Sequence, residues 1–332
     1  MYTALYDPAI TGDLVAPERI RVSGLQRIPF AQRAFRYLAP LYPAAFESFD
    51  LSGYDLVVSS TSSWAKGVRT KPEATHVCYL HTVSRFVFGY DEYLGGFGLA
   101  RAAKPVVAPL VRWDLAAARR PTAFIANSRN VAARAQNFYG RPARVVHAPV
   151  DLERFSAGEG GGDYFLVVSR LLPYKRIDLA IEACRLSDVR LVVAGSGPAR
   201  RSLERAAAGT RTEFLGAVSD GDVRELMGRA RAVLYPGEED YGLVPLEANA
   251  SGRPVIAFGR GGALETVLPG VTGEFFDEAS GASLARAIGA FDPARFDPAR
   301  LRAHAETFSP AVFKQRLREA IDEILVTGRE PA

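Results

Sequence analysis

The second half of the chain alternates between short apolar runs and longer mixed segments. The apolar runs are typical of strands buried on both faces of a sheet. Strands are expected at Tyr164–Ser169, Val189–Ala194, Thr212–Leu215, Ala232–Tyr235, Pro254–Phe258 and Gly273–Phe276. Helices are expected at Arg176–Arg185, Ala199–Ala208, Asp220–Arg229, Leu243–Ser251, Ala263–Leu268 and Ser283–Ala290. This α/β alternation predicts a parallel sheet with helices on both faces and ligands at the carboxyl ends of the strands.

The first half of the chain is less regular. Short buried strands are expected at Asp55–Ser59, Thr75–Leu80, Ala123–Ala126 and Arg144–His147. A helix capped by Ser128 is expected over Arg129–Tyr139. Residues Leu99–Ala118 indicate one or two helices, interrupted near Pro105 and Pro109. We therefore expect a second, smaller sheet in this half.

Glycines and prolines divide the chain. A cluster over Gly158–Gly162 follows an Ala-Pro-Val-Asp stretch and marks the best boundary. We predict an N-terminal domain over residues 1–150 and a C-terminal domain over residues 151–308. The remaining residues, 309–332, hold an amphipathic segment that we expect to form a helix packing across both domains.

Composition limits the class of protein. The 332 residues suffice for two domains. Cys78 and Cys184 are the only cysteines, and so few cysteines favour a reducing compartment. No apolar run approaches the roughly 20 residues that span a bilayer, and no signal peptide is visible. A cytoplasmic protein is therefore expected.

Charge is distributed unevenly between the two halves. Residues 1–150 hold 18 Lys and Arg against 10 Asp and Glu, whereas residues 151–332 hold 23 against 27. Ordinary surface variation is one explanation. The other is an anionic partner such as lipid phosphates, which would place the protein peripherally on the inner face of the membrane, with the apolar and basic segment Val106–Arg120 as a contact. Nucleic acid is not expected, because no recognition motif or basic run appears.

The most informative segment is Gly237–Glu247. It follows an apolar run and carries two carboxylates, Glu239 and Glu247, separated by a turn with an aromatic residue, a glycine and a proline. A strand, a turn and a helix beginning near Leu243 would aim free backbone N–H groups at one point, which is a phosphate site. The adjacent carboxylates suit hydroxyl groups, so the ligand expected is one with both a diphosphate and hydroxyls.

Other predicted strand ends carry cations or glycines. Arg170 and Lys175 follow the first strand of the C-terminal domain, where two cations can clamp a diphosphate, although a solvated basic loop explains them equally well when they are taken alone. Lys175 is unusual in a chain with five lysines and 36 arginines. Gly195 and Gly197 end the next strand, where small residues permit either close ligand approach or tight packing.

Two further loops have open interpretations. Gly261 and Gly262 are candidate backbone donors to phosphate; the alternative is a tight turn, with Glu265 favouring a helix N-terminus. His81 stands just beyond the strand Thr75–Leu80, and structural and functional roles are equally supported. No metal-ligand cluster, hydrolase nucleophile motif or Walker loop is present, so no metal ion and no cofactor are expected.

In combination these segments resemble glycosyltransferase family 4, the retaining enzymes of GT-B fold, in which two Rossmann-like domains face a cleft. The resemblance depends on four features in order, over about 100 residues. They are Ser169-Arg-x4-Lys175, Gly195-x-Gly197-Pro198, Glu239-x7-Glu247 and Gly261-Gly262-x-x-Glu265. The stretch Tyr79–Arg85 is similar to the histidine loop of a mannosyltransferase-like subgroup, with Val83 in place of a proline.

The resemblance implies a role for each candidate residue. Arg170 and Lys175 would hold the donor diphosphate, Glu247 the ribose hydroxyls, and Glu239 would lie near the transferred sugar, which His81 would reach from the first domain. The implied donor-binding residues are Ser169, Gly195, Gly197, Val218, Tyr241, Gly242, Leu243, Val244 and Glu247.

The function implied is transfer of a hexose from a nucleotide-sugar to a glycan or a polyprenyl-diphosphate-linked acceptor, with mannose from GDP-mannose as the first candidate. The fold also hosts phosphorylases and epimerases. The opening residues resemble the segment after the family's first strand and helix, so we expect the first domain to lack a βα unit. The opposing hypothesis is therefore a non-catalytic protein that binds nucleotide-sugars.

Overall fold

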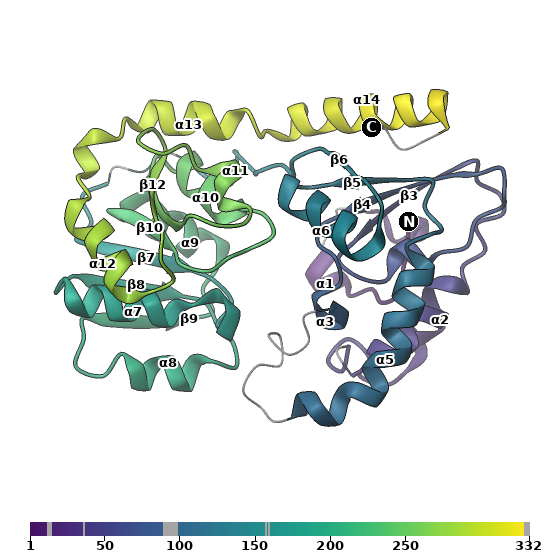
Figure 1. Cartoon of the computed structure of the whole chain (residues 1–332), viewed down its shortest axis with the longest axis horizontal. Coiled ribbons are helices and arrows are strands. Elements are labelled where there is room, and N and C mark those ends of the chain that lie inside the picture. The colour runs from purple at the N-terminus through teal and green to yellow at the C-terminus, as the bar shows by residue number, and fades with distance from the viewer. Residues whose placement is uncertain (12–14, 36, 89–98, 157, 159, 329–332) are drawn as a thin grey trace. The chain divides into compact units, whose positions relative to one another are not determined.

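The computed structural model describes residues 1–11, 15–35, 37–88, 99–156, 158 and 160–328 (Figure 1). The chain folds as two compact units. The first contains residues 1–127, 131–145 and the end of the chain from Glu319. The second contains residues 128–130 and 146–318. The last helix, α14 (Pro310–Thr327), is thus divided between the two units.

The second unit is built on a six-stranded sheet. Its strands are β7 (Tyr164–Val168), β8 (Arg190–Ala194), β9 (Thr212–Gly216), β10 (Ala232–Tyr235), β11 (Val255–Phe258) and β12 (Gly273–Phe276). All neighbouring pairs are parallel, and the order across the sheet is β9-β8-β7-β10-β11-β12. The six strands confirm the predicted parallel α/β fold, with ends that differ from the expected ones by a residue or so.

Helices connect these strands, and two apolar clusters fill the spaces between the helices and the sheet. The helices of this unit are α7 (Ile177–Leu186), α8 (Arg200–Ala206), α9 (Asp220–Arg229), α10 (Leu243–Ala250), α11 (Ala263–Thr266), α12 (Gly281–Ala290) and α13 (Pro298–Glu306). Phe165 and Val167 of β7 belong to one cluster, with Leu284 of α12, while Leu166 belongs to the other, with Leu246 of α10. Successive strand residues point to opposite faces, so both faces of β7 are buried.

The strand order defines where ligands bind. From β7 the chain runs to β8 and β9 on one side, and then returns to β10, which pairs with the other edge of β7. The loops that leave the carboxyl ends of β7 and β10 therefore diverge. In sheets of this kind a crevice opens at such a reversal of strand order, and ligands bind there.

The first unit has a four-stranded parallel sheet in the order β3-β4-β5-β6 and a separate pair, β1-β2. These strands are β1 (Tyr2–Thr3), β2 (Arg21–Val22), β3 (Leu56–Thr61), β4 (Thr75–Leu80), β5 (Ala123–Ala126) and β6 (Arg144–Val145). Its helices are α1 (Pro8–Thr11), α2 (Tyr42–Glu47), α3 (Arg85–Phe88), α5 (Leu99–Ala117) and α6 (Arg129–Tyr139), the last beginning in the second unit. The expected interruption near Pro105 and Pro109 is wrong, because α5 is one helix that continues through both prolines.

Short 3-10 helices complete the described fold. They are η2 (Pro17–Arg19), η3 (Gly24–Arg27), η4 (Ala39–Leu41), η5 (Ala65–Gly67), η6 (Pro173–Lys175) and η7 (Pro293–Arg295). Two of them, η5 and η6, lie directly after the first main strand of a sheet, β3 or β7, and each carries a lysine. These two lysines have different surroundings, because Lys66 is fully buried and Lys175 is partly exposed.

Candidate functional site

The loop after β7 brings a lysine to a carboxylate of the loop after β10. Lys175, at the end of η6, forms an ion pair with Glu239, and the side chains are 16% and 20% exposed. Both residues follow the strands between which the strand order reverses. Arg170, on the same loop as Lys175, is exposed. Two cations and a carboxylate therefore lie on the loops that leave the reversal point.

The turn that carries Glu239 is held by hydrogen bonds from three sides. The Tyr235 hydroxyl donates to the Tyr241 carbonyl at 2.8 Å, and the Tyr241 hydroxyl donates to the Ala148 carbonyl at 2.8 Å. The Gly262 amide donates to the Glu239 carbonyl at 2.8 Å. The backbone between Glu239 and Gly242 is thus fixed before any ligand binds, which lowers the ordering cost of binding.

Helix α10 begins at this turn without a side-chain cap. Gly242 is its N-cap residue and makes no capping hydrogen bond through a side chain. The first amides of a helix have no partner within the helix, so those of Leu243 and Val244 and the helix dipole favour an anion at this end. The strand, the turn and the helix start are arranged as the sequence predicts, and phosphate binding there stays a prediction.

Glu247 lies one turn into α10 and is mostly buried. Burial raises the pKa of its carboxyl to about 7, the positive charge of Arg154 lowers the pKa, and the negative charge of Asp220 raises it. Arg154 and Asp220 are themselves paired at 2.5 Å. Ser251 donates to the backbone carbonyl of Glu247, but none of the described residues donates a hydrogen bond to its side-chain carboxylate. This carboxylate is therefore available to accept hydrogen bonds from ligand hydroxyls.

Glycines permit the strand-end loops to pack closely. Gly195 has φ +139°, and a Cβ there would lie 1.9 Å from the Ser169 carbonyl oxygen. Gly261 has φ +60°, and a Cβ there would lie 2.4 Å from the Glu239 carbonyl oxygen. Side chains at either position would separate the loops that carry Arg170 and Glu239. Tight packing between the loops therefore explains why glycine occupies these two positions. Close approach of a ligand to Gly195, Gly197 and Gly261 stays a prediction.

Val218 marks the third strand end. It follows β9, is half-buried and packs against the same apolar cluster as Val244 of α10. The amide of Gly195 donates to the Gly216 carbonyl at 2.7 Å, so the loops after β8 and β9 are joined. The predicted residues of the second unit therefore lie at the carboxyl ends of its strands.

Two interpretations of the sequence need correction. The Gly262 amide is occupied by the Glu239 carbonyl, so it does not face a phosphate. Glu265 does bind a helix N-terminus, but not that of its own helix: its carboxylate accepts from the Arg129 amide at 2.8 Å and the Asn130 amide at 3.0 Å, and it lies 2.9 Å from His147 Nε2. Only the tertiary fold brings residues so distant in sequence together.

The Ser128 cap of α6 stays a prediction. The Ser128 hydroxyl donates to the Asp240 carbonyl at 2.6 Å, which leaves its oxygen able to accept a hydrogen bond. The Glu265 carboxylate serves the first two amides of that helix, which is the favourable place for a negative charge. Burial alone would raise the pKa of Glu265, but the hydrogen bonds from His147 and the two amides lower it below its ordinary value.

His81 belongs to the first unit, where its own surroundings are well defined. Its amide donates to the Thr61 carbonyl at 2.9 Å, its carbonyl accepts from Asn127 Nδ2 at 3.1 Å, and its Nε2 lies 2.8 Å from Ser60 Oγ. Burial lowers the pKa of the imidazole, so the ring is neutral at pH 7. A neutral, oriented imidazole can hydrogen-bond a hydroxyl; its role toward a sugar stays a prediction.

The described residues form neither a metal-ligand cluster nor a helix that could cross a membrane. No group of three or more His, Cys, Asp or Glu side chains in the part of the chain that the structure covers is arranged to hold a metal ion. Among those residues, no helix has the length and apolarity needed to cross a membrane.

Two protein-family models match this chain. The model described as glycosyl transferases group 1 matches residues 150–292, and the model described as Glycosyltransferase Family 4 matches residues 6–154. The two matches meet at the link between the units and together cover most of the chain.

Curated relatives match parts of the chain. A GDP-mannose-dependent alpha-(1-6)-phosphatidylinositol monomannoside mannosyltransferase of Mycolicibacterium smegmatis is 34% identical over 194 residues, which is 49% of this chain and 50% of that protein. A D-inositol 3-phosphate glycosyltransferase of Mycobacterium avium is 35% identical over 157 residues, 40% of this chain and 37% of that protein. The chain thus spans half or less of the length of these relatives.

Solved structures share the fold. Sucrose-phosphate synthase of Thermosynechococcus elongatus has a TM-score of 0.71 at 20% identity and covers 94% of this chain and 85% of its own. The Anabaena protein HepE in complex with UDP-glucose has a TM-score of 0.64 at 19% identity, with coverage of 92% and 86%. These neighbours have the GT-B fold, which the family resemblance implies for this chain. With both family models matched in sequence, the chain belongs to glycosyltransferase family 4.

Proposed function

We propose that this protein transfers a hexose from a nucleotide-sugar to a glycan or lipid-linked acceptor. The reaction retains the anomeric configuration and needs no metal ion. The observation that carries the proposal is the set of groups at one end of the second sheet: Arg170 and Lys175, the uncapped start of α10, and the buried carboxylate of Glu247.

The cations and the helix start suit a diphosphate leaving group. Breaking a glycosyl–phosphate bond leaves negative charge on the diphosphate. Lys175 and Arg170 neutralise that charge, and the amides of Leu243 and Val244 donate hydrogen bonds to it. Groups oriented in advance stabilise such charge as it develops, and this is the role that a metal ion fills in other transferases.

The two carboxylates have separate tasks. Glu247 accepts hydrogen bonds from the two ribose hydroxyls, for which an ionised carboxylate has both oxygens available. Glu239 is paired with Lys175 and lies on the turn beside the phosphate site. We assign it to the transferred sugar, where it also orients Lys175. Val218 lies near the base, and His81 contributes to binding of the sugar.

The relatives favour a mannosyl donor and a lipid-borne acceptor. The M. smegmatis relative is named for GDP-mannose and for a phosphatidylinositol acceptor, while HepE was solved with UDP-glucose. GDP-mannose is therefore the first donor to test and UDP-glucose the second. The excess of cations in residues 1–150 suits acceptors that carry phosphate, at an anionic membrane face inside the cell.

The test is an assay of transfer and a separate assay of binding. The purified protein is incubated with GDP-mannose or UDP-glucose and with acceptors that include phosphatidylinositol mannosides, inositol phosphate and polyprenyl-diphosphate-linked sugars. Product formation with retained configuration supports the proposal. Tight binding of a nucleoside diphosphate with neither transfer nor donor hydrolysis would instead identify a non-catalytic binding protein.

A further inference from the structure

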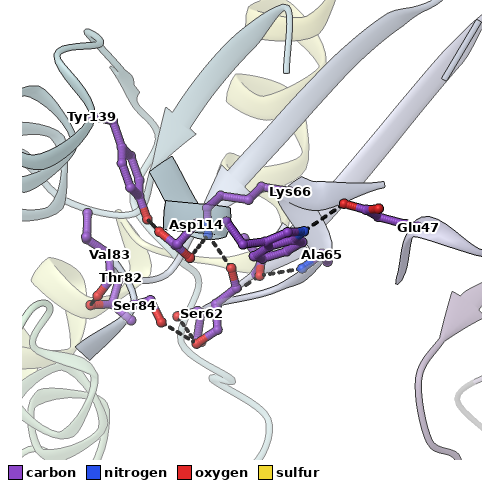
Figure 2. Close-up of polar contacts among 12 residues, drawn as sticks. Glu47, Ser62, Ala65, Lys66, Thr82, Val83, Ser84, Asp114 and Tyr139 are labelled. Atoms are coloured by element: carbon purple, nitrogen blue, oxygen red, sulfur yellow. Dashed lines mark hydrogen bonds and ion pairs between the residues drawn. The ribbon is translucent and has the colours of Figure 1, made fainter. Parts of the chain in front are cut away.

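A lysine and an aspartate are fully buried together in the first unit. The Lys66 ammonium lies 2.5 Å from Asp114 Oδ1, and the two side chains are 1% and 0% exposed. The second oxygen of Asp114 accepts from the Tyr139 hydroxyl at 2.8 Å. The ammonium also donates to the Ser63 carbonyl and lies 5.5 Å from the centre of the Tyr139 ring. Figure 2 shows that the polar ends of Lys66, Asp114 and Tyr139 converge.

This cluster joins four segments of the chain. Lys66 lies in η5, directly after β3, Asp114 lies in α5, and Tyr139 is the last residue of α6. The backbone of Ser84, in the loop after β4, hydrogen-bonds the Tyr139 hydroxyl, and the Ser84 hydroxyl donates to Ser63 Oγ at 3.1 Å. The loops that follow β3 and β4 are thus tied to each other and to both helices (Figure 2).

Stability is a poor explanation for such a pair. Removing two charges from water costs several kcal/mol for each ion, and apolar residues of similar volume often replace a buried ion pair with no loss or with a gain in stability. The unit also contains an ordinary exposed pair, Lys71 and Asp55, at 2.6 Å. What the buried pair supplies is geometry, because an ammonium with an acceptor on each of two segments permits few arrangements of the loops.

The loop after β4 carries His81, and it is held at both ends. At its start, Thr61, Ser60 and Asn127 fix the backbone and the ring of His81. At its end, Ser84 is fixed by Tyr139 and Ser63. Loss of the second anchor would leave the loop tied only at its start, and the His81 ring would sample more orientations.

We propose that Lys66, Asp114 and Tyr139 are positioning residues that hold the His81 loop, and with it the loop after β3, in the geometry that sugar transfer requires. The expected effect on turnover rests on the proposed function. The expected effect on the orientation of the His81 ring does not. The proposal predicts that substitutions in the cluster lower turnover. They should leave nucleotide binding unchanged, because we assign that binding to the second unit.

The test compares two variants with a matched control. Tyr139→Phe removes one hydroxyl, and the double variant Lys66→Met with Asp114→Leu replaces the ion pair by apolar side chains of similar size. The control is Lys71→Ala with Asp55→Ala, which removes the exposed ion pair of the same unit. We expect kcat per folded molecule to fall about 10- to 100-fold in the double variant, as displaced catalytic geometry produces. Nucleotide Kd and the melting temperature should stay near the wild-type values.

A second readout does not depend on activity. In NMR spectra of the full chain, the His81 imidazole signals should shift or broaden in Tyr139→Phe and in the double variant but not in the control. Unchanged His81 signals in a folded variant, or wild-type turnover, would overturn the positioning role. If the wild-type protein transfers no sugar, the proposed function fails while the NMR comparison still decides the inference. Should the double variant not fold, Tyr139→Phe alone decides it.

Discussion

The ion pair between Lys175 and Glu239 is the central feature at the scale of single residues. Without a donor, Glu239 neutralises a cation that the proposed reaction needs for phosphate. A donor diphosphate must therefore compete with Glu239 for the ammonium, and Lys175 is held near the phosphate position until it does. The pair explains how one lysine remains oriented in a partly exposed loop.

Replacing Lys175 by Ala is expected to lower kcat/KM. The loss should correspond to about 2–4 kcal/mol of transition-state stabilisation, as expected when an oriented donor to developing negative charge is removed. Steady-state kinetics with saturating acceptor measure the loss. Lys314→Ala, at an exposed lysine of α14, serves as the control. A turnover equal to that of the wild type would remove Lys175 from the mechanism.

The two carboxylates of the segment Gly237–Glu247 are expected to respond in opposite ways to substitution. Glu239→Gln releases Lys175 from its partner, so the affinity for nucleoside diphosphate should be equal or higher while transfer slows. Glu247→Gln weakens that affinity, because an amide offers one acceptor oxygen in place of two. Isothermal titration calorimetry with GDP and UDP separates them. Weaker diphosphate binding by Glu239→Gln would contradict the competition described above.

Affinity for the nucleoside should also depend on pH. Glu247 has a pKa of about 7 in the ligand-free protein, raised by burial, and ribose hydroxyls donate to its ionised form. Raising the pH from 6 to 8 therefore ionises the group and should tighten binding. Titrations with GDP at each pH, repeated with Glu247→Gln, remove the contribution of phosphate ionisation. Glu225→Gln, at an exposed glutamate of α9, should follow the wild type.

At the scale of elements, the sequence locates most strands and helices of the second unit. It does not predict the contacts between elements that are distant in sequence. The sequence predicts β10 and β12 with both ends correct. Strand β10 is an uninterrupted apolar run buried throughout, whereas the edge strand β12 contains Glu274 and is only partly buried. Helix α13 was not predicted, and α5 was expected to break at its prolines. The sequence does not predict that Glu265, 135 positions away, accepts hydrogen bonds from the first two amides of α6.

The Glu265 contact should be visible as stability. The carboxylate accepts hydrogen bonds from two helix amides and His147 while only 7% exposed, so Glu265→Gln should lower the free energy of unfolding by about 1–3 kcal/mol at pH 7. Its pKa is lower in the folded protein than in the unfolded chain. The stabilisation is therefore complete above the unfolded pKa and is lost as the pH falls through the folded one.

Thermal unfolding of Glu265→Gln and of the wild type at several pH values measures this difference. The gap in melting temperature should be largest near pH 7 and shrink below pH 4. Glu278→Gln, at an exposed glutamate paired with Arg286 at 3.5 Å, is the control. A gap independent of pH would show that the charge of Glu265 contributes nothing.

At the scale of the whole molecule, the proposed chemistry uses only side chains and backbone amides to stabilise the negative charge of the leaving diphosphate. Addition of EDTA should then leave the rate of transfer unchanged, and Mg²⁺ or Mn²⁺ should not restore activity to Lys175→Ala. The measurement is initial rate against chelator concentration with dialysed protein. A rate that falls with EDTA and recovers with a divalent cation would exclude the proposed division of roles.

The sequence alone determined the α/β class, the alternation of strands and helices from β7 to α12, the position of Arg170, Lys175 and Glu239 just after strands, and that of Glu247 one turn into a helix. It could do so because strand burial and strand–turn–helix spacing are local properties of the chain. The tertiary structure decided the reversal of strand order between β7 and β10, the Lys175–Glu239 pair, the Glu265 cap and the buried Lys66–Asp114–Tyr139 cluster. Each of these joins residues separated by tens of positions or more, and no local pattern encodes which distant groups the packing of a sheet will bring into contact.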